Sequence, residues 1–153
     1  MSCAVPAPID GPADETAASP RIVWTTVDPP VGLVSINQSA TSTEFRIIQV
    51  DDPNVADKLT IRFFVDYHRD TTIQREFTLL ADPGSTTPTI RTGVIFSAPT
   101  ALFGSNPTAS AHLVEAIVSD RGFSDTGQTT NINRNVPSDA RTDYIAWTVQ
   151  VVP

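Results

Sequence analysis

The chain has 153 residues, of which 40% are hydrophobic, and this is enough for one domain with a buried core. It carries 10 Lys and Arg against 17 Asp and Glu, and the net charge of -7 disfavours binding to nucleic acid or to anionic lipid. The single cysteine excludes an internal disulfide and a zinc site built on cysteine pairs. No apolar run reaches the length of about 18 residues that a membrane span needs.

The first twenty residues differ in composition from the rest of the chain. Four prolines, three acids and many alanines surround Val5 and Ile9, the only large aliphatic side chains. Such a segment cannot bury enough apolar surface to offset the entropy of ordering it. We therefore expect a disordered or extended tether over 1–20 and one folded domain over 21–153.

From Arg21 onward, short apolar runs with a period of two predict strands. In chain order these runs are RIVWTT, VGLVSI as a short edge segment, TEFRIIQV, LTIRFFVDY, REFTLLA, IRTGVIF, HLVEAIVSD and YIAWTVQVV. The apolar phase slips between Ile47 and Ile48, which predicts a β-bulge. Asp28-Pro29-Pro30 and Asp82-Pro83-Gly84 are typical of turns or corners. The segment APTALFG is expected to form at most one helical turn.

The clearest run, LTIRFFVDY, separates into two faces. Five apolar or aromatic side chains share the face predicted to be buried: Leu59, Ile61, Phe63, Val65 and Tyr67. Thr60, Arg62 and Asp66 fall on the other face. Trp147, Tyr67 and Trp24 are expected to face the core, which leaves Tyr144 and Phe64 as the main exposed aromatic side chains.

Seven or eight strands, with no helices to cover parallel crossovers, predict an all-β antiparallel sandwich. Leu102 and Phe103 lie where the chain crosses from one sheet to the other. They either plug the open end of the sandwich or form an exposed contact. The plug is favoured because large apolar groups are rarely left in water without a partner.

The last two predicted strands resemble those of immunoglobulin-like domains common on bacterial surfaces, including polycystic-kidney-disease-type and fibronectin-like domains. The residues that carry the resemblance are His112, Val114, Ala116, Val118, Ser119, Asp120, Trp147, Thr148, Val149 and Val151. The resemblance covers about 40 residues and implies an immunoglobulin-like fold more than a function. The long segment between the two strands departs from the compact repeats.

Ser2-Cys3 followed by a Pro/Ala-rich stretch resembles the layout of bacterial lipoproteins, in which a signal peptide is cut immediately before a cysteine. This resemblance implies a lipidated Cys3 and a place in the bacterial cell envelope, with membrane contact only through that anchor. The chain itself begins without a signal peptide, so the alternatives are a processed lipoprotein or a cytosolic protein with an incidental thiol.

No catalytic chemistry is evident, and neither a catalytic residue nor a cofactor is predicted. The chain has two histidines, His68 and His112, and no Gly-x-Ser-x-Gly motif for a serine nucleophile. Asp66, His68 and Asp70 alternate along one strand and could converge on a metal, although a solvated strand end is favoured.

Acids also gather in VDDPNVAD and in SDRGFSD. The residues concerned are Asp51, Asp52, Asp57, Asp120 and Asp125. Carboxylates in such loops can bind calcium, but these spacings match no defined calcium loop. Acids that cap turns are the favoured interpretation, and no metal site is predicted.

The connection from Arg121 to Asp143 has about 20 residues, where a hairpin needs two to five. It is either a functional binding loop or a solvated insertion, and the sequence leaves both open. The candidate partner-binding residues are Arg121, Phe123, Asn131, Asn133, Arg134 and Arg141.

The sequence therefore favours a non-catalytic, lipid-anchored envelope domain that binds a protein partner or takes part in self-assembly. A carbohydrate-binding or hydrolase-accessory module is one alternative. A phage or virion decoration protein is another, and in that case Cys3 is incidental.

Overall fold

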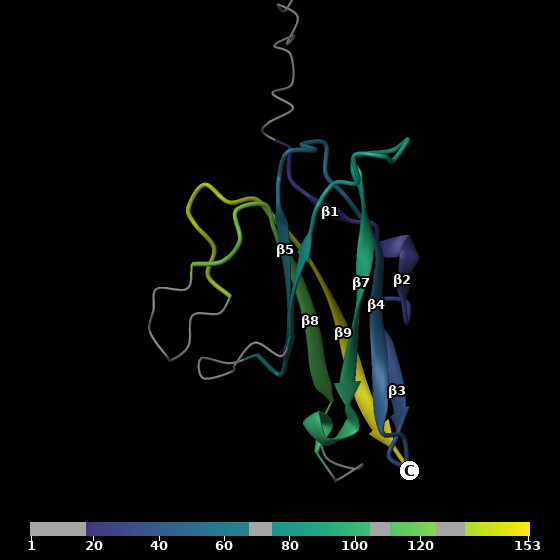
Figure 1. Ribbon diagram of the computed structural model, residues 1–153. Coiled ribbons are helices and arrows are strands. Elements are labelled where there is room, and N and C mark those ends of the chain that lie inside the picture. The colour runs from purple at the N-terminus through teal and green to yellow at the C-terminus, as the bar shows by residue number, and fades with distance from the viewer. Residues whose placement is uncertain (1–17, 68–74, 105–110, 125–133) are drawn as a thin grey trace, which may run out of the picture.

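The computed structural model describes residues 18–67, 75–104, 111–124 and 134–153, and over these ranges the chain forms two β-sheets (Figure 1). Its strands are β1 (Arg21–Ile22), β2 (Val27–Asp28), β3 (Leu33–Asn37), β4 (Ser42–Asp51), β5 (Leu59–Val65), β6 (Arg75–Leu79), β7 (Ile90–Pro99), β8 (His112–Ser119) and β9 (Thr142–Val152). Two 3-10 turns, η2 (Trp24–Thr26) and η3 (Thr100–Phe103), complete the described elements. The predicted all-β sandwich is confirmed.

The first sheet is built around β4. Strand β7 runs antiparallel along one edge of β4, from the pair Ser42–Pro99 to the pair Asp51–Ile90. Strands β1 and β2 both pair with β4 as well, and η2 separates them. The other edge of this sheet is therefore an interrupted strand.

The second sheet has the order β3-β9-β8-β5-β6. All its pairs are antiparallel except β3 and β9, which run parallel with Leu33 beside Thr148. The prediction of a wholly antiparallel sandwich is wrong at this pair. A period-two pattern shows which face of a strand is buried, but it carries no information on the direction of the neighbouring strand. The predicted position of VGLVSI at an edge is confirmed.

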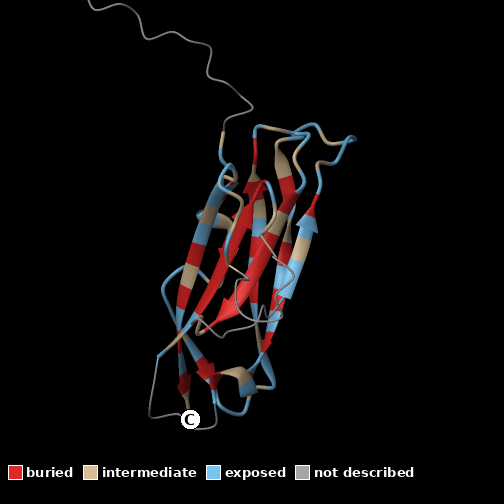
Figure 2. Cartoon of the chain, turned by 90° about the vertical axis from the view of Figure 1, so that its left-hand side faces the viewer, coloured by how far each residue is buried: buried red, intermediate tan, exposed pale blue. Residues whose placement is uncertain are grey.

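The core lies between the two sheets, where the buried residues of both meet (Figure 2). Phe45 of β4 packs against Trp147 of β9 with ring centroids 5.1 Å apart, and Phe63 packs against Phe96 at 5.0 Å. Trp147 Nε1 donates a hydrogen bond of 2.7 Å to the Pro29 carbonyl, so the indole is buried with its polar group satisfied.

Strand β4 does change face between Ile47 and Val50, both of which are buried, while Ile48 is exposed. Its register with β7 stays constant, however, since Ile47 pairs with Val94 and Gln49 with Thr92. The predicted bulge is therefore wrong. Neither strand has an extra residue, and the buried face changes in β4 and in β7 at the same place. A Cβ on Gly93 would lie 1.5 Å from the Ile47 carbonyl oxygen, so the strands can approach this closely only at a glycine.

The connection after β7 closes one end of the sandwich. Residues 100–103 form the short helical turn that was expected. Phe103 is buried and Leu102 packs partly buried against the core. The plug, and not the exposed contact, is thus confirmed for these two side chains.

Candidate binding surface

Part of the outer face of the second sheet is covered by the segment that follows β8. Arg62 and Phe64 of β5 lie on this outer face, opposite the core, yet Arg62 is only 3% exposed and Phe64 is fully buried. Glu115 and Ile117 of β8 are buried beside them. The expectation that Phe64 is an exposed aromatic side chain is wrong, because the chain folds back over it.

Two arginine contacts hold this segment to the sheet. The guanidinium carbon of Arg62 lies 4.3 Å from the centre of the Phe123 ring. Arg134 Nη2 donates a hydrogen bond of 2.8 Å to Glu115 Oε1, and the same guanidinium lies 5.0 Å from the Tyr67 ring. In Figure 1 this segment is the green and yellow-green chain that extends to the left of β5.

Tyr67 was expected to continue the core face of β5, and this expectation is wrong. Asp66 has a φ of 48°, which turns the chain at the end of the strand. Tyr67 consequently packs edge-on against Phe64, with ring centroids 5.1 Å apart. Asp66 stabilises the turn, because Oδ1 accepts a hydrogen bond from the Leu113 amide and Oδ2 lies 2.6 Å from His112 Nδ1.

The candidate loop residues are therefore divided between different environments. Phe123 and Arg134 lie on the sheet, as described above. Arg121 is more exposed and its Nη1 lies 4.0 Å from Asp57 Oδ1. The Arg141 amide donates to Asp120 Oδ1 at 2.7 Å. Asn131 and Asn133 lie outside the described residues, and a role of this segment in partner binding stays a prediction.

Exposed apolar side chains lie on the rest of this outer face and next to it, on the η2 turn at the edge of the first sheet. Trp24 is 68% exposed and Tyr144 is 64% exposed. Leu33 of β3 and Leu113 of β8 are both exposed, and both pair with Thr148 of β9, so they form a row across three strands. The expectation that Trp24 faces the core is wrong, because η2 interrupts the strand and breaks its alternation.

Trp24, Val31 and Tyr144 line an open hollow of about 460 Å³. Asp143 fixes its two walls relative to one another, since Oδ2 accepts a hydrogen bond of 2.8 Å from the Ile22 amide. Asp143 Oδ1 accepts a second hydrogen bond from the Tyr144 amide at 2.9 Å. The strand before Trp24 is thereby tied to the strand that carries Tyr144. We refer to Trp24, Val31, Leu33, Leu113 and Tyr144 together as the apolar face.

The acids of the two predicted clusters act partly in turns. Asp52 Oδ1 accepts a hydrogen bond from the Asn54 amide at 3.1 Å, and its Oδ2 lies 3.7 Å from Nη2 of the fully buried Arg91. Burial raises the pKa of Asp52 above its usual value.

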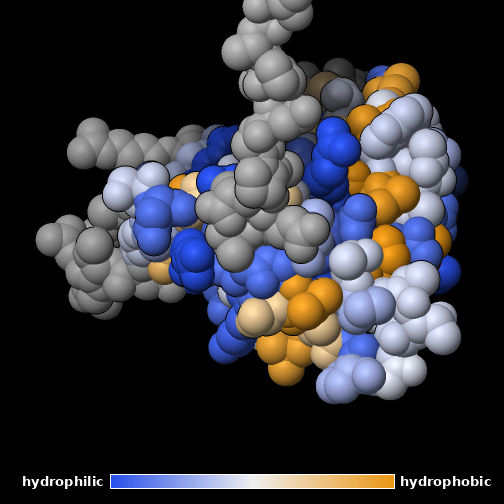
Figure 3. Space-filling view, turned by 90° about the horizontal axis from the view of Figure 1, so that it is seen from above, coloured by the Kyte–Doolittle hydropathy of each residue, from blue (hydrophilic) through white to orange (hydrophobic). Residues whose placement is uncertain are grey.

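The end of the sandwich seen in Figure 3 presents mainly hydrophilic atoms, with hydrophobic atoms in separate groups.

No group of three or more His, Cys, Asp or Glu within the described ranges could hold a metal ion. His68, Asp70 and Asp125 lie outside those ranges, as does Cys3. No helix in the described part of the chain is long and apolar enough to cross a membrane.

Comparison with protein-family models, curated proteins and solved structures finds no match to this chain. The structure itself shows the fold class, an all-β sandwich of two sheets.

Proposed function

We propose that this chain is a non-catalytic immunoglobulin-like domain that binds a protein partner through its apolar face. The observation that carries the proposal is the contrast between two groups of apolar side chains. The chain covers Phe64 of β5 and Ile117 of β8 with its own residues, whereas the five large apolar side chains of the apolar face remain exposed. Exposed apolar patches of this kind mark interaction sites, and Trp and Tyr are enriched among the residues that contribute most binding energy.

The strand order supports the immunoglobulin-like part of this proposal. Strands β1, β4 and β7 take the places of A, B and E in one sheet, and β5, β8 and β9 take those of C, F and G in the other. The buried Trp147 lies on β9, so the core tryptophan is not on the C strand as it is in antibody domains.

Cys3 supports a further part of the proposal, namely attachment to a bacterial envelope by a lipid on its thiol. Intact-mass measurement of the protein from its native host tests this directly. We expect the mass of a chain that begins at Cys3 and carries a diacylglyceryl group, and an unmodified chain beginning at Met1 contradicts the anchor.

Partner binding is tested with the double variant Trp24→Ser/Tyr144→Ser and the control Leu80→Ser. Leu80 is as exposed as these two aromatic side chains but does not belong to the apolar face. We expect a defined protein to be retained by the immobilised wild type and by the control, and to be lost with the double variant while its melting temperature is unchanged. Equal retention by all three contradicts the proposal.

A carbohydrate-binding module is the second candidate, because Trp24 and Tyr144 line one hollow and sugars stack on exposed aromatic rings. Binding of soluble oligosaccharides that is lost in the double variant would favour this candidate over a protein partner.

The non-catalytic part of the proposal is tested on ester, peptide and polysaccharide substrates. Turnover that is abolished by His112→Ala contradicts it.

A further inference from the structure

Strand β7 is a long edge strand without the features that normally protect an edge. It has ten residues, and within the described part of the chain it pairs only with β4. Its one charged side chain, Arg91, is fully buried. Proteins usually protect edges with short strands, exposed charges, prolines or bulges, because unpaired backbone groups invite another strand. Only Pro99, at the very end of β7, belongs to this set.

The other edges of the two sheets differ from β7 in just these respects. Strands β3 and β6 have five residues each, and β6 carries Arg75 and Glu76. The edge made of β1 and β2 is interrupted by η2. Strand β7 is therefore the longest and least protected edge in the described structure.

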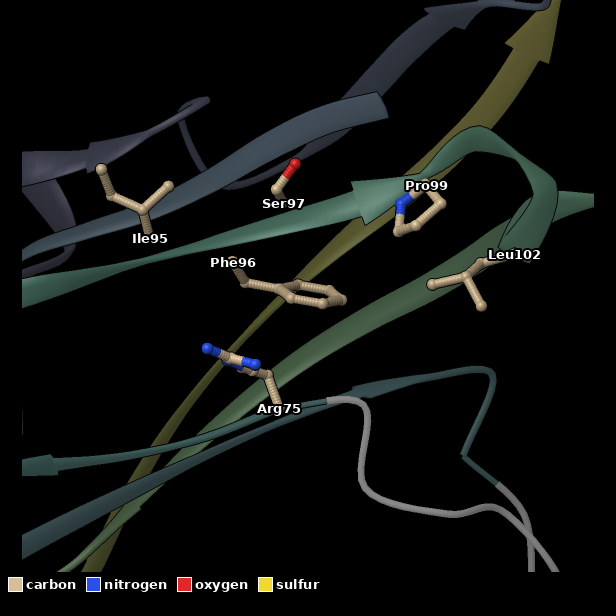
Figure 4. Close-up of a pocket in the computed structure, with 6 residues that line it drawn as sticks. All are labelled: Arg75, Ile95, Phe96, Ser97, Pro99 and Leu102. Carbon is tan, nitrogen blue, oxygen red and sulfur yellow. The ribbon is translucent and has the colours of Figure 1, made fainter. Parts of the chain in front are cut away.

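An open hollow of about 420 Å³ lies beside this edge (Figure 4). Phe96 points into the space between the sheets, toward Arg75 of β6, and Leu102 of η3 lies at one end. Ile95 points to the opposite side of β7 and is 51% exposed. The strand thus has an apolar side chain on each face next to the unpaired edge.

We propose that β7 of one copy pairs antiparallel with β7 of a second copy about a two-fold axis, so that the two four-stranded sheets become one. A second copy fits this edge because β7 carries no exposed charge. The strands can meet without placing like charges opposite each other, although each chain has a net charge of -7.

The inward and outward faces of β7 limit which residues of the two copies can lie opposite each other. Directly opposite residues of antiparallel strands lie on the same face of a sheet, so the exposed Ile95 must oppose an outward residue. Ile95 opposite its own counterpart satisfies this condition and keeps residues 91–99 within the paired stretch. Val94 then lies opposite Phe96 of the partner subunit, and both belong to the core side. The apolar interior of the sandwich continues across the axis.

This self-association goes beyond the partner binding proposed above and uses a different surface. It is tested by sedimentation of the full chain over concentrations from about 1 μM to 1 mM. The variant Ile95→Lys is compared with Ile48→Lys, which places the same charge on the same sheet at a side chain that is 52% exposed but not on the β7 edge.

We expect the wild type and Ile48→Lys to dimerise, and Ile95→Lys to raise the dissociation constant by tenfold or more while its circular dichroism is unchanged. A wild type that stays monomeric throughout overturns the proposal. Equal dimerisation of the two variants, or loss of the dimer in Trp24→Ser/Tyr144→Ser, overturns it as well.

Disulfide trapping provides a second measurement that also tests the register. In a Cys3→Ser background, Ile95→Cys should form a cross-linked dimer on mild oxidation, because opposite residues of antiparallel strands have Cα atoms about 4.5–5.5 Å apart. Ile48→Cys in the same background should not. Cross-linking at position 48 in place of position 95 contradicts the pairing.

Discussion

Arg134 and Glu115, nineteen positions apart in the chain, are joined by a hydrogen bond of 2.8 Å from Nη2 to Oε1 on the outer face of the second sheet. The carboxylate is buried, whereas the guanidinium remains about one-third exposed. The long connection between β8 and β9 is therefore attached to the fold at its Arg134 end. Phe123, stacked under Arg62, attaches it at the other end.

Replacing Arg134 with alanine should lower the free energy of unfolding by about 1–3 kcal/mol, because it leaves the buried Glu115 carboxylate without this donor. Arg121→Ala is the matched control. Its guanidinium is half exposed and 4.0 Å from Asp57, so its loss should cost at most about 0.5–1 kcal/mol. Urea unfolding measures both values, and equal destabilisation by the two changes would argue against a role for Arg134 in holding the segment.

Two deletions in the connection between β8 and β9 should have different effects on stability. Replacing residues 126–132 with a short Gly-containing turn should change the melting temperature by only a few degrees, since loop closure changes by about 0.6 kcal/mol per doubling of length. A deletion that also removes Phe123 and Arg134 should cost much more, because Phe64 and Ile117 would lose their cover at about 1.5–3 kcal/mol for each exposed side chain. Thermal unfolding of both variants checks this, and equal melting temperatures contradict it.

Gly93→Ala should be one of the most damaging small substitutions in the chain. The added methyl group would lie 1.5 Å from the Ile47 carbonyl oxygen, so β4 and β7 would have to separate. We expect a loss of about 3 kcal/mol or more in the free energy of unfolding. Gly84→Ala, whose methyl group would have its nearest contact at 3.4 Å, should stay within about 0.5 kcal/mol of the wild type.

The core faces could be predicted from the sequence, because alternation in LTIRFFVDY and YIAWTVQVV reports directly on burial. Leu59, Ile61, Phe63 and Trp147 are all in the core as expected. The same alternation could not show that Arg62 and Phe64 are buried too. Their cover comes from a distant segment, and a strand's own pattern carries no signal of what packs on its second face.

The apolar face was the least predictable part of the molecule. The sequence predicts Trp24 to face the core, but the 3-10 turn at Trp24–Thr26 interrupts the strand and leaves the side chain exposed. Tyr144 was correctly expected to be exposed. That these two rings line one hollow depends on β1 lying beside β9, a contact between the two ends of the domain that no local pattern encodes.

The two tryptophans should respond differently to a soluble quencher. Trp24 is exposed and Trp147 is fully buried, so acrylamide should quench one component of the emission strongly and leave the other nearly unchanged. Trp24→Phe should remove the accessible component and shift the remaining emission to shorter wavelength. A wild type in which both tryptophans are equally protected would contradict the exposure of Trp24.

The most direct test of the central claim is site-specific photo-cross-linking in the native host. A photoreactive amino acid is placed at Trp24 or Tyr144 on the apolar face, or at the equally exposed Leu80 as a control. We predict one discrete protein adduct from positions 24 and 144 and none from position 80. If positions 24 and 144 give no protein adduct, or if position 80 gives the same adduct, the apolar face is not the partner-binding surface.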